Sequence, residues 1–232
     1  MVEVLAWFEV NKKRLLTAAG ILLAIAFVAY AWSYLQSQRE LRSNDALLAL
    51  NVSFNGPTNI PPAASGDLLK VAREFSGTKA AERASFLAAS AMFSEGKYAE
   101  AQGQFEKFQA DFPSSRLSPS AAIGAAVALE SQGKTAEALT AYQTFPTRFP
   151  GSGVLTQAKF AQARLNEEKK QIAEAYKLYE EVAKSGSFST WVEQAMQRKE
   201  QLSIKHPDLA KTNAPSVVKP ALPAGAPTPA AK

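Results

Sequence analysis

Apolar residues fill one uninterrupted segment near the start of the chain. Residues 15–35 read LLTAAGILLAIAFVAYAWSYL and contain no charged side chain. As a helix rising about 1.5 Å per residue, this segment would be roughly 30 Å long, which matches the hydrocarbon thickness of a bilayer. A buried core helix would normally be shorter and would carry polar residues on one face. We therefore predict a single transmembrane helix over residues 15–35.

Charged residues flank this segment unequally. Three basic residues at positions 12–14 precede it directly, whereas Arg39 and Arg42 begin several residues beyond its end. By the positive-inside rule, residues 1–14 stay in the cytoplasm and everything after the span is translocated. Aromatic residues at positions 30, 32 and 34 lie where the outer aromatic belt of a membrane helix would be.

A cleaved signal peptide is the alternative interpretation of the same segment. A basic start, an apolar run and the sequence Ala29-Tyr30-Ala31 resemble the three regions of a signal peptide, with cleavage after Ala31. The apolar run is longer than such a peptide usually has, which favours a retained anchor. No cysteine follows the run, so a lipid-anchored lipoprotein is excluded, and both interpretations place the main domain outside the cytoplasm.

Beyond the span, the pattern of small, apolar and polar residues repeats every 37 residues. Residues 96–101 read GKYAEA, residues 133–138 read GKTAEA, and residues 170–175 read KQIAEA. The connectors FPSS at 112–115 and FPGS at 149–152 keep the same offset. A repeat of this length indicates a stack of similar supersecondary units, because one unit alone cannot bury its apolar face.

Each copy predicts a helix, a tight turn and a second helix. The first helix is rich in alanine, Gly96 or Gly133 ends it, and Pro113 or Pro150 stops the second helix. Apolar residues recur at every third or fourth position of the second helices, as expected for a buried stripe. The predicted stripes are Ala99, Phe105 and Phe108; Ala136, Leu139, Tyr142 and Phe145; and Tyr176, Tyr179 and Val182.

These signals predict an all-α protein with a transmembrane helix, a helical-hairpin solenoid and a disordered tail. Residues 36–78 would form a degenerate first repeat with a Pro-rich interruption at residues 56–66. Three repeats over 79–190, a capping helix over 191–206 and a Pro/Ala-rich tail over 207–232 would follow.

Composition removes most catalytic chemistry. The chain has no cysteine and one histidine, His206, which excludes thiol nucleophiles, disulfides and metal sites that need two imidazoles. The motifs of P-loop, dinucleotide-binding, serine-hydrolase and zinc-protease sites are not found in the sequence. We therefore predict that the protein is not an enzyme and needs no cofactor or metal.

The net charge of +5 lies at the two ends of the chain. Residues 1–39 carry four basic residues against two glutamates, and residues 211–232 carry three lysines and no acid, which leaves residues 40–210 neutral. A neutral domain has no electrostatic attraction to a phosphate backbone, so we predict no nucleic-acid binding.

The repeats resemble the tetratricopeptide repeat family. The third copy departs from the family pattern at Lys170 and Gly186, which replace the turn glycine and the phenylalanine at the helix end. The period is longer than the 34 residues usual for the family, and the connectors hold the extra length. The matching positions are Gly96, Tyr98, Ala101, Phe105, Phe108 and Pro113 in one copy and Ala126, Leu129, Gly133, Ala138, Tyr142, Phe145 and Pro150 in the next.

The beginning of the chain resembles the bacterial ancillary subunits of the SecYEG translocon. The resemblance rests on the aromatic pair Trp7-Phe8, on residues 11–13 (NKK), and on a span that ends near Trp32 and leads directly into degenerate repeats. It implies a single-pass protein of the bacterial inner membrane with periplasmic repeats. Its partners would be Sec translocon subunits, periplasmic chaperones or translocating chains.

In repeat solenoids the first helix of each pair lines the concave side, which makes it the candidate protein-binding groove. An apolar floor rimmed by charge would suit an amphipathic helix or an unfolded segment. The alternative is that the capping helix or the degenerate first copy covers these residues. The family register places Arg83, Phe86, Ser90 and Phe93 in the groove from the first full copy, Ser120, Ile123, Val127 and Glu130 from the second, and Gln157, Phe160, Arg164 and Glu167 from the third.

Two functions therefore stay open from the sequence. One is an interaction module that docks on the secretion machinery and holds chaperones or clients. The other is a self-associating scaffold for envelope biogenesis, in outer-membrane assembly or cell-division coordination, in which Gly20 and Ala24 offer a small-x-x-x-small face for pairing of the spans into a homo-oligomer.

Overall fold

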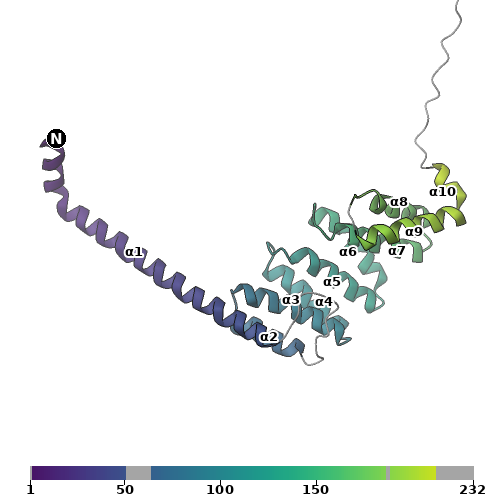
Figure 1. Cartoon of the computed structure of the whole chain (residues 1–232), viewed down its shortest axis with the longest axis horizontal. Coiled ribbons are helices and arrows are strands. Elements are labelled where there is room, and N and C mark those ends of the chain that lie inside the picture. Colours follow the sequence, from purple (N-terminus) through teal and green to yellow (C-terminus); the bar gives the residue numbers. More distant parts are fainter. Residues whose placement is uncertain (1, 51–63, 187–188, 213–232) are drawn as a thin grey trace, which may run out of the picture. The chain divides into compact units, whose positions relative to one another are not determined.

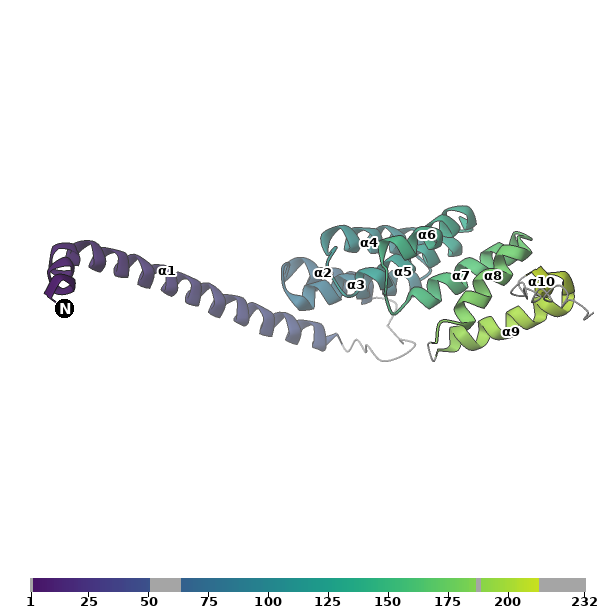
Figure 2. The same ribbon diagram turned by 90° about the horizontal axis from the view of Figure 1, so that it is seen from above.

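The computed structural model describes residues 2–50, 64–186 and 189–212 (Figures 1 and 2). Every regular element in these ranges is a helix, which confirms the predicted all-α class. The chain divides into two compact units, Met1–Ala141 and Tyr142–Lys232, and the boundary between them falls within helix α6. The helices are α1 Val2–Ala49, α2 Ala64–Glu74, α3 Lys79–Ser94, α4 Tyr98–Asp111, α5 Ser118–Ser131, α6 Thr135–Arg148, α7 Leu155–Glu168, α8 Ile172–Ala183, α9 Thr190–Lys205 and α10 Pro207–Thr212.

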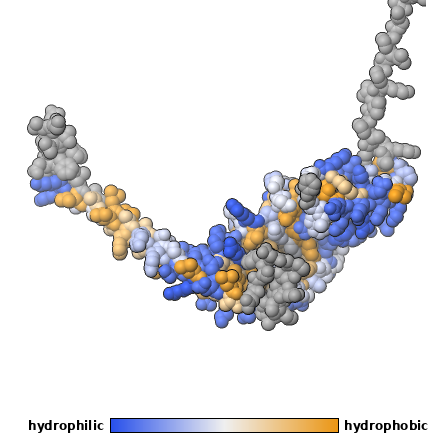
Figure 3. Space-filling view, viewed as in Figure 1, coloured by the Kyte–Doolittle hydropathy of each residue, from blue (hydrophilic) through white to orange (hydrophobic). Residues whose placement is uncertain are grey.

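Helix α1 contains the predicted span and extends well beyond it. Between Leu16 and Leu35 its large apolar side chains are 57–73% exposed, so this segment is not a core helix (Figure 3). The part of α1 from Lys12 to Ala49 is long and apolar enough to cross a membrane.

The last turns of α1 belong to the repeat region. Ser43 and Leu47 are buried, and Leu47 joins an apolar cluster with Leu68 and Val71 of α2 and with residues of α3. The apolar segment therefore continues into the repeats as one helix, without an intervening loop. Most of the expected Pro-rich interruption lies outside the described residues, and its last residues begin α2.

Helices α2 to α5 pack each against the next along the chain. The small residues of α3 are buried on two sides, because Ala84 packs in the cluster with α2 while Ala89 packs in the cluster with Phe105 and Phe108 of α4. Helices α4 and α5 approach closely, since a Cβ atom on Gly124 would lie 2.6 Å from the ring of Phe105. Small residues on the first helices thus make room for aromatic rings on the second helices, as the sequence predicts.

The second unit has its own core, formed by α7, α8 and α9. Tyr176, Tyr179 and Val182 of α8 are buried there against Phe160 of α7 and against α9. Helix α9 occupies the place of the expected capping helix. The chain then continues into α10, and Leu209 of α10 packs against the same core.

Three turns show the repeat most clearly. Gly96 and Gly133 have φ of 77°, and Lys170 has φ of 62°, which is the left-handed conformation that a side chain disfavours. In each turn this residue donates its N–H to the carbonyl three positions earlier, at 3.0, 2.8 and 3.0 Å, and the next N–H reaches five positions back at 2.9 Å. The backbone thus repeats with the period of 37 even where the glycine is lost.

Two details of the sequence prediction are wrong. Ala99 and Ala136, each placed in an apolar stripe, are exposed, whereas Ala101 and Ala138 are fully buried at 0% exposure. The buried alanine thus lies two residues later in each second helix than the predicted one. The tail was expected from residue 207, but helix α10 forms there, and residues 213–232 lie outside the described residues.

Candidate protein-binding surface

The candidate surface of the first unit is built on α3 and α5, the first helices of two consecutive hairpins. These helices contact one another directly, and α4 packs against both. Helix α3 begins at a defined point because Thr78 caps it, accepting the N–H of Ala81 at 3.1 Å. Helix α5 is almost entirely alanine and other small or apolar residues, so it can pack closely on more than one side.

The four predicted residues of α3 divide into accessible and packed positions. Arg83 is exposed, and Ser90 is half-buried with its hydroxyl donating to the carbonyl of Phe86 at 3.3 Å. Phe86 turns toward α4, where its ring meets both Phe105 and Phe108 with centroids 5.7 Å apart. Phe93 is half-buried against Tyr98, with centroids 5.1 Å apart.

The four predicted residues of α5 divide similarly. Ile123 is 5% exposed and belongs to the core. Ser120, Val127 and Glu130 are half-buried and keep part of their surface accessible. The accessible part of the predicted surface in this unit therefore consists of Arg83, Ser90, Phe93, Ser120, Val127 and Glu130.

The predicted residues of the second unit lie on α7. Phe160 is 7% exposed and stacks against Tyr179 of α8 and Trp191 of α9, so the capping helix covers it. Arg164 is half-buried, with an ion pair to Glu168 at 2.7 Å, and Gln157 is also half-buried.

Glu167 of α7 takes part in a buried hydrogen bond. The hydroxyl of Tyr179, which is fully buried, donates to Glu167 at 3.0 Å, and Arg198 of α9 lies 3.8 Å from the other carboxylate oxygen. Burial, followed by the hydrogen bond to Glu167 and the charge of that glutamate, raises the pKa of Tyr179. Glu167 therefore holds α7, α8 and α9 together.

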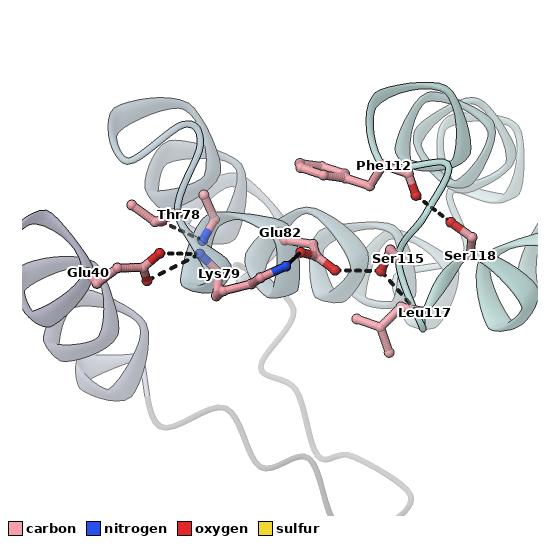
Figure 4. A network of polar contacts seen from close by, with 9 residues as sticks. Glu40, Thr78, Lys79, Glu82, Phe112, Ser115, Leu117 and Ser118 are labelled. Atoms are coloured by element: carbon pink, nitrogen blue, oxygen red, sulfur yellow. Dashed lines mark hydrogen bonds and ion pairs between the residues drawn. The ribbon is translucent and has the colours of Figure 1, made fainter. Parts of the chain in front are cut away.

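A polar network that the sequence does not reveal joins α1, α3 and the connector after α4 (Figure 4). The backbone N–H of Lys79 donates to both carboxylate oxygens of Glu40, at 2.9 and 3.2 Å. The side chain of Lys79 forms an ion pair with Glu82 at 3.0 Å, and Ser115 donates its hydroxyl to Glu82. Burial opposes ionisation of Glu82, but the hydrogen bonds from Ser115 and Lys79 outweigh it and lower the pKa.

The connector itself is held by the serines of the FPSS sequence and the helix that follows. Ser115 accepts the N–H of Leu117 at 3.0 Å, and the hydroxyl of Ser118 donates to the carbonyl of Phe112 at 2.6 Å (Figure 4). These bonds fix the end of α4 against the start of α5. The serines and the proline of this short sequence predict a turn. No residue near Glu40 in the sequence indicates that Glu40 lies beside it.

Within the described residues, no group of three or more histidine, aspartate or glutamate side chains is arranged to hold a metal ion. The surfaces described above offer half-buried apolar side chains, hydroxyls and charges on helices. This arrangement defines a helical-hairpin repeat protein.

The comparisons with known proteins agree with this class. A family profile described as "Tetratricopeptide repeat-like domain" matches residues 5–144, and the chain belongs to this family. No curated protein sequence matches.

The solved structures that match include crystal structures of nearly identical TPR-like repeats of a protein described as a kinesin light chain from Podosopora anserina, and of a single-substitution variant. Each has 16% identity and a TM-score of 0.51, covering 77% of this chain and 91% of that chain. At this identity the likeness shows the fold. Proteins with tetratricopeptide repeats generally act as non-catalytic scaffolds for protein–protein interaction, and no enzyme family is indicated.

Proposed function

We propose that this protein is a membrane-anchored interaction module of the bacterial inner membrane, with its repeats in the periplasm. It would serve as an accessory factor of the Sec translocon and the periplasmic chaperone network. The observation that carries the proposal is the single helix α1, in which an exposed apolar segment continues into turns that pack against the repeats through Ser43 and Leu47.

Two further observations support the anchor and its direction. The family match begins at residue 5, so the apolar segment and the repeats belong to one family unit. Basic residues at positions 12–14 precede the apolar segment, and positive residues next to a span favour the cytoplasmic side. The repeats would then stand outside the cytoplasm, where emerging chains and their chaperones are found.

The accessible part of the predicted groove supports the binding of protein segments. Phe93 and Val127 are half-buried apolar side chains, and Ser90 and Glu130 lie on the same two helices. Such a mixture suits an amphipathic helix or an extended segment, because apolar contacts supply affinity and the polar rim supplies orientation.

The direct experiment is a pull-down of the full-length protein in mild detergent, with partners identified by mass spectrometry. The variant Ser90→Asp/Val127→Asp places charge on the accessible surface, and Ala110→Asp places it on an exposed position of α4 as the matched control. We expect translocon subunits and chaperones with the wild type and the control, and loss of the chaperones with the double variant. Circular dichroism must show equal helicity for all three proteins.

Two results would contradict the proposal. Recovery of the protein alone, with a mass by light scattering above that of a monomer, would favour the self-associating scaffold. Recovery of envelope-assembly proteins that the double variant does not affect would remove the translocon from the proposal. The topology is tested separately by a single cysteine at Ser131, because the chain contains no other cysteine and a membrane-impermeant maleimide reaches only the periplasmic side.

A further inference from the structure

The start of α3, where it meets α1, is rich in basic side chains. Lys79 and Arg83 project from the first turns of α3, and Arg116 projects from the connector that Ser115 ties to α3; all three are exposed. Together with Glu82, Ser114, Ser115 and Leu117 they line a cavity of about 680 Å³, a volume within the range of small-ligand pockets.

The contact of α1 with the start of α3 places this cavity close to the bilayer that would hold α1. If residues 15–35 fill the hydrocarbon, Glu40 lies five residues further, which is about 7.5 Å along the helix axis. The headgroup region of each leaflet is roughly 5–8 Å thick. Because Glu40 binds the backbone of Lys79 directly, the start of α3 lies at the level of the headgroups.

The charge at this level is positive. Arg39 and Arg42 of α1 are also exposed, and within the described part of the chain neither they, nor Arg83, nor Arg116 forms an ion pair with a carboxylate. Of the carboxylates nearby, Glu40 caps α3 and Glu82 pairs with Lys79, while Asp45 of α1 is exposed. Five basic residues against these three acids leave an excess of two positive charges around the start of α3 and the end of α1.

We propose that Arg83, Arg116 and Lys79 bind the phosphate of an anionic phospholipid headgroup in the membrane that holds α1. Guanidinium groups bind phosphate through paired hydrogen bonds, and the hydroxyl of Ser114 is an additional donor at the cavity. Basic residues near an anionic surface each contribute about 1 kcal/mol, which corresponds to a fold-change of about five. This inference rests on the proposed membrane anchor and adds a lipid preference to it.

The absence of cysteine allows the contact to be measured at a chosen position. Ser114→Cys labels the cavity, and Ser131→Cys labels the opposite end of α5, about 20 Å away along the helix axis; both serines are exposed. The labelled full-length proteins are inserted into nanodiscs of phosphatidylcholine, with or without phosphatidylglycerol at about one lipid in three, which gives an anionic surface. Headgroup-quencher lipids then report the contact of each label with the surface.

We expect phosphatidylglycerol to increase quenching at position 114 and to leave position 131 unchanged. The variant Arg83→Glu/Arg116→Glu should weaken the response at position 114 by tenfold or more, whereas Lys134→Glu, which reverses an exposed charge at the far end of α5, should preserve it. Both variants must keep the helicity and melting temperature of the parent.

The outcomes separate the two proposals. If the protein does not co-elute with nanodiscs, the membrane anchor fails and the lipid site fails with it. If it co-elutes but position 114 responds equally with and without phosphatidylglycerol, only the lipid site is overturned. If soluble glycerol phosphate changes the label at position 114 in pure phosphatidylcholine and removes the response to phosphatidylglycerol, the cavity is a free-phosphate site and the assignment to lipid is overturned.

Discussion

The carboxylate of Glu40 accepts the backbone N–H of Lys79 through both of its oxygens, so a residue of the long apolar helix α1 caps the first full repeat helix. The two residues are 39 positions apart in the sequence. A negative charge at this position also favours the positive end of the α3 dipole. Helix α1 and the repeats are therefore joined by a specific polar contact as well as by the apolar packing of Leu47.

Replacing Glu40 with alanine should weaken this junction. We expect Glu40→Ala to lower the free energy of unfolding of the first unit by about 1 kcal/mol, since a cap to α3 is lost. Asp45→Ala removes an exposed carboxylate from the same helix and should have little effect. Hydrogen exchange of α3 and the end of α1, measured in detergent, checks both variants. Equal exchange in the two would show that the contact adds no stability.

The close approach of Gly124 to Phe105 should make this position intolerant of any side chain. A Cβ atom there would lie 2.6 Å from a ring that is only 4% exposed, so Gly124→Ala should destabilise the protein by roughly 1–3 kcal/mol. Gly103→Ala is the matched control, because nothing lies within 4 Å of it and alanine favours a helix by about 1 kcal/mol. Thermal melts should shift in opposite directions for the two variants.

The left-handed Lys170 should be an unfavourable choice for its turn. Lys170→Gly retains the φ of 62° without the steric cost of a side chain, and we expect a gain in stability of about 1 kcal/mol. Gly133→Lys makes the reverse change in the equivalent turn and should lose a similar amount. Chemical denaturation of the second unit measures the first variant. A loss of stability in Lys170→Gly would show that the lysine side chain makes a contribution that outweighs its backbone cost.

The hydrogen bond from Tyr179 to Glu167 should make stability depend on alkaline pH. The pKa of Tyr179 in the folded protein is raised above its ordinary value of 10.0, so its contribution is fully present below pH 10 and is lost as the pH rises toward the folded pKa. Tyr179→Phe should lower stability at neutral pH by about 1 kcal/mol and reduce the loss above pH 10. Denaturation at a series of alkaline pH values checks this, with Tyr176→Phe for comparison. An unchanged slope in Tyr179→Phe would contradict the assignment.

Local signals account for the part of the fold that the sequence predicts. The hairpins could be predicted from local sequence, namely glycine at the turns and proline after the second helices. The register could be predicted from the repeated offset of 37 residues. Even Lys170 occupies the expected place, because hydrogen bonds across the turn impose the left-handed conformation on whichever residue stands there.

The candidate surface could be predicted only in part. A repeat register indicates which helix carries a residue, but it does not indicate how deeply the side chain of that residue is buried. Phe86 and Ile123 occupy groove positions by register, yet Phe86 packs on the rings of α4 and Ile123 is buried. The contact of Glu40 with Lys79 and the basic cavity beside it depend on packing between distant segments. No pattern within either segment could have indicated them.

The unbroken course of α1 fixes how the repeats are rotated about the helix axis relative to the apolar segment. An α-helix turns by about 100° per residue, so inserting one alanine between Leu35 and Glu40 would rotate helices α2 to α5 by that angle relative to the apolar side chains before it. Four inserted residues would restore the phase to within about 40° while raising the unit by about 6 Å. Under the proposed anchor, α1 therefore sets the direction in which the repeats face, and a partner in the same membrane must approach from that side.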